Sequence, residues 1–458
     1  MSLSPATSVD TQSPTAKLAA RICEIDFDSL DAVTISAVKR LITDGIAVAV
    51  AGTRETAPAI VAEYVREMAG SPLATVWGFG FRTTPGNAAY ANAVSMHVLD
   101  FEPMSLPSTH AVSPTVPVAM ALAEARNANG RDLIAACAKG FEIQGRLLAA
   151  ARPARGSLPF HTPGVIGVMG SAVAAAHLLR LKPAQLANAL GMAASRCSGL
   201  PANTGSMVKC THCGNAAAAG LEAASLAARG FTAHPTILEA HHGYIETFFP
   251  HHFDYGVLFD FGRPYRCADP GMAIKFYPSK YPTHFGIAAA LDVRAAVGDP
   301  AGIRQVRIVT PEILDADRPQ PRVGLEGKFS FQYTVAAALL DGKVGIHSFT
   351  DERRFSPDMV ALLAKTTLVR DKSIPPDTSK MHVEVEVTLN DGTSHTRICR
   401  KPPGTWGVPV NADQHRSKIR DCLSARLAQA PLDHALGLLD NLERATAPDV
   451  AQLMALLA

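Results

Sequence analysis

A lysine and a histidine lie near the start of the stretch MVKCTHCGNAAAAG, residues 207–220. Lys209 and His212 precede an alanine-rich run that predicts a helix. The free N–H groups and the positive dipole end of a helix N-terminus attract anions. The stretch has no glycine-rich phosphate loop, so these two side chains predict a site for a carboxylate.

The same stretch contains a Cys-x-x-Cys pair, Cys210 and Cys213. A structural zinc site needs four ligands, and no second Cys or His pair follows at zinc-finger spacing. A thioredoxin-like dithiol needs a βαβ setting, whereas this region reads as helical throughout. We therefore interpret both cysteines as small side chains buried in a tightly packed helix.

Acid–base candidates occur in two other segments. Asp100 follows a helical run that carries His97, and His110 comes after an irregular, proline-containing loop. His161 immediately precedes Thr-Pro-Gly, where another helix begins. Imidazoles transfer protons near neutral pH, and a carboxylate can orient them. The simpler interpretations are a helix cap for Asp100, a surface loop for His110 and a satisfied core histidine for His97.

Two lysines lie near the point where the sequence pattern changes from helical spacing to a mixture of helices and strands. Lys275 and Lys280 lie in the aromatic and proline-rich stretch AIKFYPSKYPTH, and Tyr333 follows in a later helical run. A domain boundary is a common place for a binding cleft. The histidine pairs at 241–242 and 251–252 lack the helical pairing with an acid that metal sites use, so we expect solvated loops there.

The bulk composition narrows the class of protein. The chain has 458 residues, 47% hydrophobic and 18% charged, with a net charge of +2. This predicts a globular protein with no nucleic-acid partner and no membrane partner. The first residues lack a signal or transit pattern, and no run of about 18 apolar residues occurs. Eight scattered cysteines are typical of reduced thiols, so we expect a cytoplasmic protein.

Hydrophobic periodicity predicts a mainly α protein with a smaller α+β part. Helical spacing dominates 17–267, whereas the alternation in MHVEVEVTLNDG indicates a strand and a hairpin turn. We predict a large all-helical domain built from both chain ends, plus an α+β lid domain. The predicted boundaries are a flexible N-terminal tail at 1–16, helical residues 17–267, the lid at 268–404, and a helical return at 405–458.

The chain resembles the MmgE/PrpD family, which includes 2-methylcitrate dehydratase, cis-aconitate decarboxylase and iminodisuccinate epimerase. The resemblance covers about 17 to 455. It is carried by YANAVSMHVLDFEP with STHAVSPTVPVAMALAEA, by FHTPGVIGVMGSAVAAAHLLRL, LANALGMAASRCSGL and MVKCTHCGNAAAAG, and by AIKFYPSKYPTH and KFSFQYTVAAALLDG.

The resemblance implies a homodimer that acts on a small di- or tricarboxylate without a metal or an organic cofactor. It also implies a site between the two domains. Transferred position by position, the resemblance implies these catalytic residues: Asp100, His110, His161, Lys209 and Tyr333. The implied substrate-binding residues are Met104, His212, Lys275 and Lys280.

Two positions differ from the family pattern. Met104 stands where the family commonly has a threonine in Asp-x-Asp-Asp-Thr, and Lys280 stands where decarboxylases tend to have a histidine. We therefore place dehydration of a 2-methylcitrate-like hydroxy acid first, by proton transfer next to a carboxylate. Epimerisation, isomerisation or decarboxylation of a related polycarboxylate are the alternatives. Two other classes are a non-catalytic carboxylate-binding dimer and a metal-dependent hydrolase built on the paired histidines.

Overall fold

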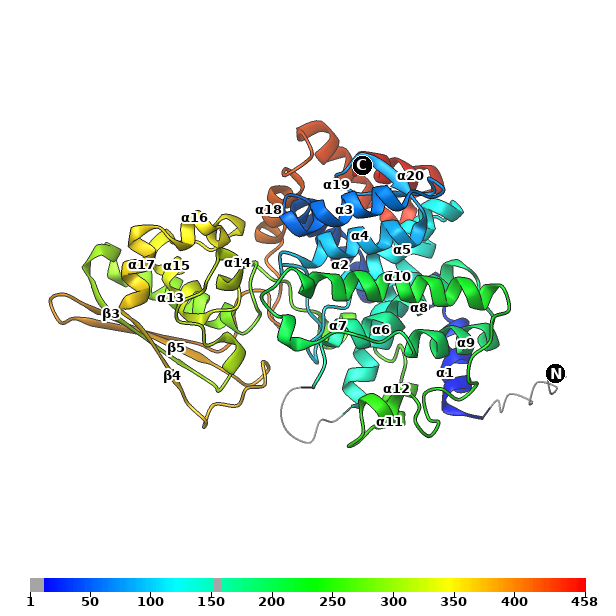
Figure 1. Ribbon diagram of the computed structural model, residues 1–458, viewed down its shortest axis with the longest axis horizontal. Coiled ribbons are helices and arrows are strands. Elements are labelled where there is room, and N and C mark those ends of the chain that lie inside the picture. The colour runs from blue at the N-terminus through cyan, green and yellow to red at the C-terminus, as the bar shows by residue number, and fades with distance from the viewer. Residues whose placement is uncertain (1–11, 152–157) are drawn as a thin grey trace.

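The protein forms two lobes, a large helical lobe and a smaller lobe that contains a sheet (Figure 1). The computed structural model describes residues 12–151 and 158–458. The helices of the large lobe are α1 (Pro14–Glu24), α2 (Ala32–Gly52), α3 (Thr56–Met68), α4 (Pro85–His97), α5 (Val112–Arg126), α6 (Gly130–Ala150), α7 (Thr162–Val165), α8 (Gly167–Leu178), α9 (Pro183–Ala194), α10 (Val208–Ala228), α11 (Tyr244–Phe248), α12 (Tyr255–Phe259), α18 (Ala412–Leu423), α19 (Gln429–Asp440) and α20 (Ala447–Leu456).

The smaller lobe is an α+β unit. Its elements are α13 (Thr283–Val297), β3 (Ile303–Thr310), α14 (Gly324–Gly327), α15 (Phe331–Asp341), α16 (Asp351–Arg354), α17 (Pro357–Ala364), β4 (Thr366–Arg370), β5 (Val383–Leu389) and β6 (Ser394–Cys399). The sheet order is β4-β3-β5-β6, with β3 and β4 parallel and the other pairs antiparallel.

The alternating pattern of β5 explains how this sheet packs. Val383, Val385 and Val387 are buried, whereas Glu384 and Glu386 are partly exposed. Successive side chains of a strand point to opposite faces, so one face of β5 is apolar. That face packs with α13 and α15 in the hydrophobic core of the lobe, and the helices lie on one side of the sheet in Figure 1.

The C-terminal helices return to the helical lobe. The helices α18 to α20 are coloured orange to red in Figure 1, where α18 and α19 pack against α2 and α20 packs against α5. Lys418 of α18 donates to both carboxylate oxygens of Asp44 in α2 at 2.8 Å, and His415 lies 2.9 Å from the same group. The mainly α fold class with a small mixed sheet is therefore confirmed. The numerical domain boundaries stay a prediction.

Two details of the helical lobe differ from the prediction. A hairpin of β1 (Ala74–Val76) and β2 (Phe81–Thr83) interrupts the helices. Three-residue strands are too short for an alternating pattern to stand out. The predicted tail at 1–16 falls largely outside the described residues, and α1 begins at Pro14. Within the described residues, no helix combines the length and the apolar character that a membrane span requires.

Close helix packing brings the start of α10 to the end of α4. A Cβ on Gly214 would lie 2.8 Å from Tyr90 and Val94 of α4. A Cβ on Gly220 would lie 2.6 Å from the backbone nitrogen of Ala172 in α8. The small residues of α10 therefore allow backbones to approach more closely than larger side chains would permit. This approach places Lys209 beside the residues that follow α4.

Candidate active site

The site is built around Asp100, which lies in the turn after α4. Its backbone adopts a left-handed conformation with φ of 51°, and its N–H donates to the carbonyl of His97 at 3.1 Å. Such a conformation is uncommon for a residue other than glycine, although aspartate tolerates it better than most. The turn must therefore be held by its surroundings.

Two lysines hold the carbonyl groups on either side of Asp100. Lys328 of the α+β lobe donates to the carbonyl of Leu99 at 3.3 Å. Lys418 of α18 donates to the carbonyl of Phe101 at 2.9 Å. Three segments that are distant in sequence thus meet at this turn, so the position of the Asp100 side chain depends on the assembled tertiary structure.

The carboxylate of Asp100 joins the two lobes electrostatically. Its Oδ2 accepts from Nζ of Lys209 at 3.0 Å, and its Oδ1 accepts from Nζ of Lys275 at the entrance to the α+β lobe. Nε2 of His110 lies 3.6 Å from Oδ1. The Asp100 and Lys275 side chains are 4% and 0% exposed, so water screens this pair little.

Burial and neighbouring charge compete at these groups. Burial acts to raise the pKa of the Asp100 carboxyl, but the Lys209 and Lys275 ammonium groups outweigh it and hold that pKa well below its ordinary value. Burial lowers the pKa of Lys275, against the attraction of Asp100. Burial also lowers the pKa of Lys328 to about 8. At neutral pH the site therefore contains ionised Asp100 among several cations.

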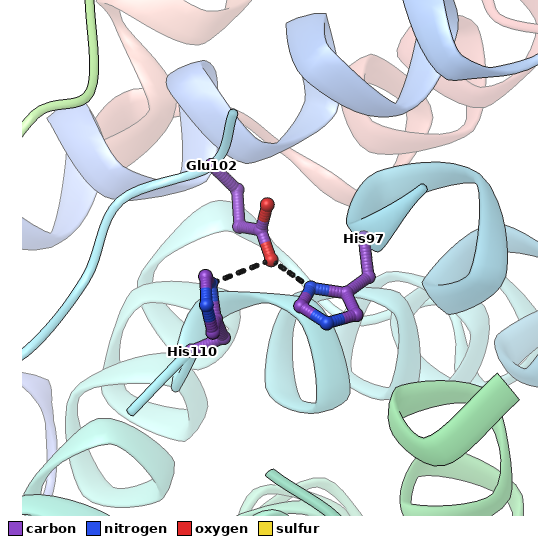
Figure 2. A group of neighbouring side chains, drawn as sticks. All are labelled: His97, Glu102 and His110. Atoms are coloured by element: carbon purple, nitrogen blue, oxygen red, sulfur yellow. Dashed lines mark hydrogen bonds and ion pairs between the residues drawn. The ribbon is translucent and has the colours of Figure 1, made fainter. Parts of the chain in front are cut away.

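A second carboxylate, Glu102, lies beside Asp100 and contacts two histidines (Figure 2). Its Oε1 lies 2.5 Å from Nδ1 of His97 and 3.0 Å from Nδ1 of His110. The hydroxyl of Ser113, in the first turn of α5, donates to the same oxygen at 2.7 Å. Nε2 of His97 in turn lies 3.0 Å from Nζ of Lys209. A continuous polar chain therefore runs from Lys209 through His97 and Glu102 to His110.

The buried members of this chain have shifted pKa values. Burial lowers the pKa of His97 to about 4, and the Lys209 ammonium acts in the same direction. Burial acts to raise the pKa of Glu102, but the charges of His97 and His110 and their hydrogen bonds hold it well below its ordinary value. His97 is therefore neutral and Glu102 ionised at neutral pH.

His97, Glu102 and His110 also have the residue types and the proximity of a metal site, since their potential ligand atoms lie within 4.8 Å of one another. Nδ1 of His97 lies at hydrogen-bond distance from Glu102 Oε1, at 2.5 Å. Nδ1 of His110 forms an ion pair with the same oxygen at 3.0 Å, without the geometry of a hydrogen bond. These direct contacts between the three side chains account for the arrangement. His241, His242 and Glu246 form a similar group, and all three are exposed.

His161 and His212 form a separate pair, and the His161 ring lies 5.7 Å from the His97 ring. Their Nδ1 atoms lie 2.9 Å apart. Burial lowers the pKa of both imidazoles, and the Lys209 ammonium acts in the same direction. Two neutral rings can share this bond, with one N–H donating to the other nitrogen. A Cβ on Gly199 would lie 3.3 Å from the His212 ring, and the φ of 126° at this position disfavours a larger residue.

Three residues implied by the resemblance have their described hydrogen-bond and ion-pair partners away from the Asp100 carboxylate. Lys280 pairs with Asp315 inside the α+β lobe. Tyr333 packs in the core of that lobe, and its hydroxyl donates to the carbonyl of Ser348 at 2.6 Å. Met104 forms a backbone bridge with Ala273 across the lobes and buries its side chain. The roles predicted for these three residues stay predictions, and no described contact supports them.

The two cysteines of the opening stretch are buried, and no disulfide involves them. Burial raises the pKa of Cys210 to about 12 and that of Cys213 well above its ordinary value. A buried, protonated thiol is a weak nucleophile and a poor metal ligand. Their positions agree with the packing interpretation.

The sequence analysis missed Lys328 and gave no role to Glu102 or His97. Lys328 opens the stretch KFSFQY, in which the predicted site residue is Tyr333. A single lysine before an aromatic run carries no distinguishing pattern. The sequence did offer a signal for Glu102, which is a carboxylate five residues after His97 and eight before His110, the two histidines that it contacts.

Comparison with known protein families gives matches over most of the chain. Residues 16–255 match the MmgE/PrpD N-terminal domain, and residues 277–444 match the MmgE/PrpD C-terminal domain. The gap between the two matches contains the segment that passes from the helical lobe to the α+β lobe, including Lys275.

Curated relatives are similar over nearly their whole length. A cis-aconitate decarboxylase of Mus musculus is 31% identical over 419 residues, covering 88% of this chain and 86% of the relative. The cis-aconitate decarboxylase of Homo sapiens is 31% identical over 425 residues, with the same coverage. A cis-aconitate decarboxylase of Aspergillus terreus is 24% identical over 462 residues, covering 94% of this chain and 93% of the relative.

Proposed function

Because the chain belongs to the MmgE/PrpD family, we propose that it is a decarboxylase of a small tricarboxylate related to cis-aconitate. The relatives named cis-aconitate decarboxylase support this substrate class. The observation that carries the proposal is the Asp100 carboxylate, which is shared by Lys209 of the helical lobe and Lys275 of the segment between the lobes, with an imidazole 3.6 Å away.

The charge of the site suits a polyanionic substrate. Lys209, Lys275 and Lys328 supply three ammonium groups against the two carboxylates of Asp100 and Glu102. An ammonium has three N–H donors. Lys209 directs one towards Asp100 and one towards His97, which leaves a donor for a substrate carboxylate. Preorganised cations of this kind stabilise charge that develops during a reaction.

Loss of CO2 from such a substrate moves an electron pair into the carbon skeleton. In cis-aconitate the C–C bond to the CH2-borne carboxylate breaks, and its electron pair forms a new C=C bond. The original double bond shifts its electrons towards the carbon next to the terminal carboxylate. Lys209 and Lys275 stabilise the resulting charge on that carboxylate.

The carbanion then takes a proton. His110 delivers it from Nε2, the nitrogen that faces Asp100, and becomes neutral. The tricarboxylate plus one proton thus becomes CO2 and a dicarboxylate with a terminal methylene group. The His161–His212 pair lies beside this centre and offers a neutral N–H donor for a third carboxylate. Water returns the proton to His110 before the next turnover.

The structure weakens one argument for dehydration. Lys280 was expected to bind an additional anionic group, but its ammonium pairs with Asp315. The sequence analysis placed dehydration first and decarboxylation among the alternatives, and the named relatives favour decarboxylation. A homodimer stays a prediction that analytical ultracentrifugation tests.

A proton NMR time course in D2O tests the function. Purified protein is incubated separately with cis-aconitate, citrate and 2-methylcitrate. Decarboxylation of cis-aconitate gives a pair of new methylene vinyl signals, with deuterium entering next to a carboxylate. His110→Gln is expected to abolish both changes while circular dichroism shows a native fold.

Other results identify the alternatives. A new vinyl signal from citrate or 2-methylcitrate would establish a hydro-lyase and contradict decarboxylation as the main activity. Thermal stabilisation by cis-aconitate without any product would favour the non-catalytic, carboxylate-binding class. Loss of activity on dialysis against a chelator would bring back a metal-dependent mechanism.

A further inference from the structure

Glu102 is the buried group that contacts both histidines of the polar chain. Its Oε1 faces Nδ1 of His97 at 2.5 Å and Nδ1 of His110 at 3.0 Å (Figure 2). The hydroxyl of Ser113 donates to the same oxygen at 2.7 Å. The Glu102 side chain is 0% exposed. An ionised carboxylate accepts hydrogen bonds and cannot donate them. His97 must therefore carry its proton on Nδ1, where it hydrogen-bonds to Glu102. Nδ1 of His110 makes an ion pair with the same oxygen, and a proton on this nitrogen avoids repulsion between its lone pair and the carboxylate.

Lys209 gives an independent indication for His97. An ammonium is a donor only, so Nε2 of His97, 3.0 Å from Nζ, must offer a lone pair. Glu102 on one side and Lys209 on the other thus specify the same neutral Nδ1–H tautomer. His97 therefore links Lys209 to Glu102 through two hydrogen bonds.

The same carboxylate determines which nitrogen of His110 is available for chemistry. With Nδ1 paired with the Glu102 carboxylate at 3.0 Å, Nε2 is left to face Asp100 at 3.6 Å and to exchange a proton. A rotated ring or the other tautomer would direct the wrong nitrogen towards the reacting carbon. Orientation of a catalytic imidazole by a buried carboxylate is worth several orders of magnitude in other enzymes.

We propose that Glu102 is a positioning residue that fixes the tautomers and orientations of His97 and His110, and so makes Nε2 of His110 the proton-transfer atom. This inference rests on the proposed function for the role of His110. Glu102 stays ionised through the cycle. It compensates the positive charge when His110 gains its second proton, and no bond to Glu102 forms or breaks.

The first test reads the tautomers directly and requires no activity. Nitrogen-15 NMR of the labelled wild-type protein, assigned with His97→Gln and His110→Gln, reports which ring nitrogens carry protons. We expect a protonated Nδ1 on both residues at neutral pH and an unprotonated Nε2 on His97. A His97 protonated on Nε2, or a His110 without a proton on Nδ1, would overturn the proposal.

The second test uses Glu102→Gln, which keeps the size of the side chain but removes its charge. We expect kcat to fall by about 10²- to 10⁴-fold, with KM changed less than about threefold. The acidic limb of the pH–rate profile should move, and the nitrogen-15 signals of both rings should become mixtures of tautomers. Glu102→Asp, which keeps the charge, should recover part of kcat.

Glu124 provides a matched control on the same helix as Ser113. It is a largely buried carboxylate near the other end of α5, where it accepts from the N–H and hydroxyl of Thr75 and pairs with Arg82. Glu124→Gln should leave kcat, the pH profile and both tautomers unchanged. If Glu102→Gln behaves in the same way, Glu102 has only a structural role and the proposal is wrong.

The two tests separate this inference from the function itself. A wild-type protein that is inactive on the tricarboxylates would contradict the proposed function, while the nitrogen-15 spectrum would still decide the tautomers. If Glu102→Gln fails to fold, the wild-type spectrum and the Glu102→Asp kinetics decide the question. Loss of both Nδ1–H signals on addition of zinc chloride alone, at a stoichiometric amount, would make Glu102 a metal ligand and overturn the positioning role.

Discussion

Among the residues that the structure describes, a buried lysine lies at the same distance from a histidine in two places, and the second histidine is only partly buried. Nζ of Lys209 lies 3.0 Å from Nε2 of His97, and Nζ of Lys139 in α6 lies 3.0 Å from Nδ1 of His177 in α8. Burial and the adjacent lysine lower the pKa of His97 to about 4 and that of His177 to about 3. Considered alone, the two pairs are chemically alike.

The carboxylates around the pairs differ. Lys209 has Asp100 at 3.0 Å, and His97 has Glu102 at 2.5 Å. Within residues 12–151 and 158–458, Lys139 has no carboxylate oxygen within 4.0 Å, and burial lowers its pKa to about 8. A buried lysine beside a histidine therefore does not identify a site. The distinguishing feature is a set of carboxylates that keeps the lysine charged and orients the imidazoles.

Replacing each lysine in turn should give the largest difference in activity between the two lysine–histidine pairs. Lys209→Met should lower kcat/KM for the tricarboxylate by about 10³-fold or more, because it removes a preorganised cation from the reacting charge. Lys139→Met should leave kcat/KM within about threefold of wild type. Initial rates measured with cis-aconitate, on variants that fold normally by circular dichroism, provide the comparison. Equal losses in both variants would contradict the assignment of the site to Lys209.

Replacing Asp100 removes a carboxylate that distinguishes the Lys209–His97 pair from the Lys139–His177 pair. Asp100→Asn removes the shared negative charge and leaves Lys209 and Lys275 facing each other. We expect kcat to fall by about 10²-fold, and the free energy of unfolding to fall by about 3 kcal/mol because buried cations lose their partner. Stopped assays and urea denaturation measure the two effects. An active variant with wild-type stability would show that Asp100 does not organise these lysines.

Acid should destabilise both pairs through their histidines. The folded pKa of His97, about 4, and that of His177, about 3, lie below the ordinary value of 6.5. The unfolded chain therefore binds protons first, and stability falls as the pH drops from about 6.5 towards 4. Asp100 and Glu102, whose folded pKa values are depressed, lose their stabilising contribution as the pH falls through those values.

A single substitution measures how much His177 contributes to the loss of stability at acidic pH. His177→Gln should lose less stability than wild type between pH 6.5 and 4, by on the order of 3 kcal/mol. Its activity should stay close to that of wild type, because His177 lies outside the site. Thermal denaturation at a series of pH values gives the measurement. An unchanged pH dependence of stability would mean that His177 is not buried in its neutral form.

The smallest expected effect is a fall in kcat/KM at alkaline pH. Burial lowers the pKa of Lys328 and of Lys139 to about 8. Loss of the Lys328 proton weakens its hold on the Asp100 turn, so kcat/KM should fall up to about tenfold above pH 8. The decline should persist in Lys139→Met and disappear in Lys328→Met. A decline that remains in Lys328→Met would point to Lys275 instead.

Sequence reasoning succeeded where the signal was local. The strand Val383–Leu389 alternates apolar and acidic residues, and the structure confirms that its valines are buried. The helix Phe331–Asp341 ends before Gly342, which has φ of 66° as a helix-terminating glycine requires. Such patterns report interactions between residues a few positions apart, so they need no knowledge of the fold.

The sequence was less informative about roles that depend on where a side chain points. Tyr333 is close in sequence to Lys328, yet it directs its hydroxyl to Ser348 whereas Lys328 crosses to Leu99 in the other lobe. A buried tyrosine hydroxyl needs a hydrogen-bond partner, and the nearest carbonyl in the lobe supplies it. No pattern in the stretch KFSFQY indicates which of the two residues reaches the site.

The sequence by itself determined the mainly helical class, the return of the chain end, and the presence of Asp100, His110 and Lys209 as chemically capable groups. Tertiary structure decided which of these groups meet. Lys328 and Lys418 reach the turn at Asp100 from segments more than 200 positions away in the chain. Glu102 gains its role only because His97 and His110 converge on one oxygen. Hydrogen bonds and ion pairs act over a few ångströms of space, whatever the separation in sequence.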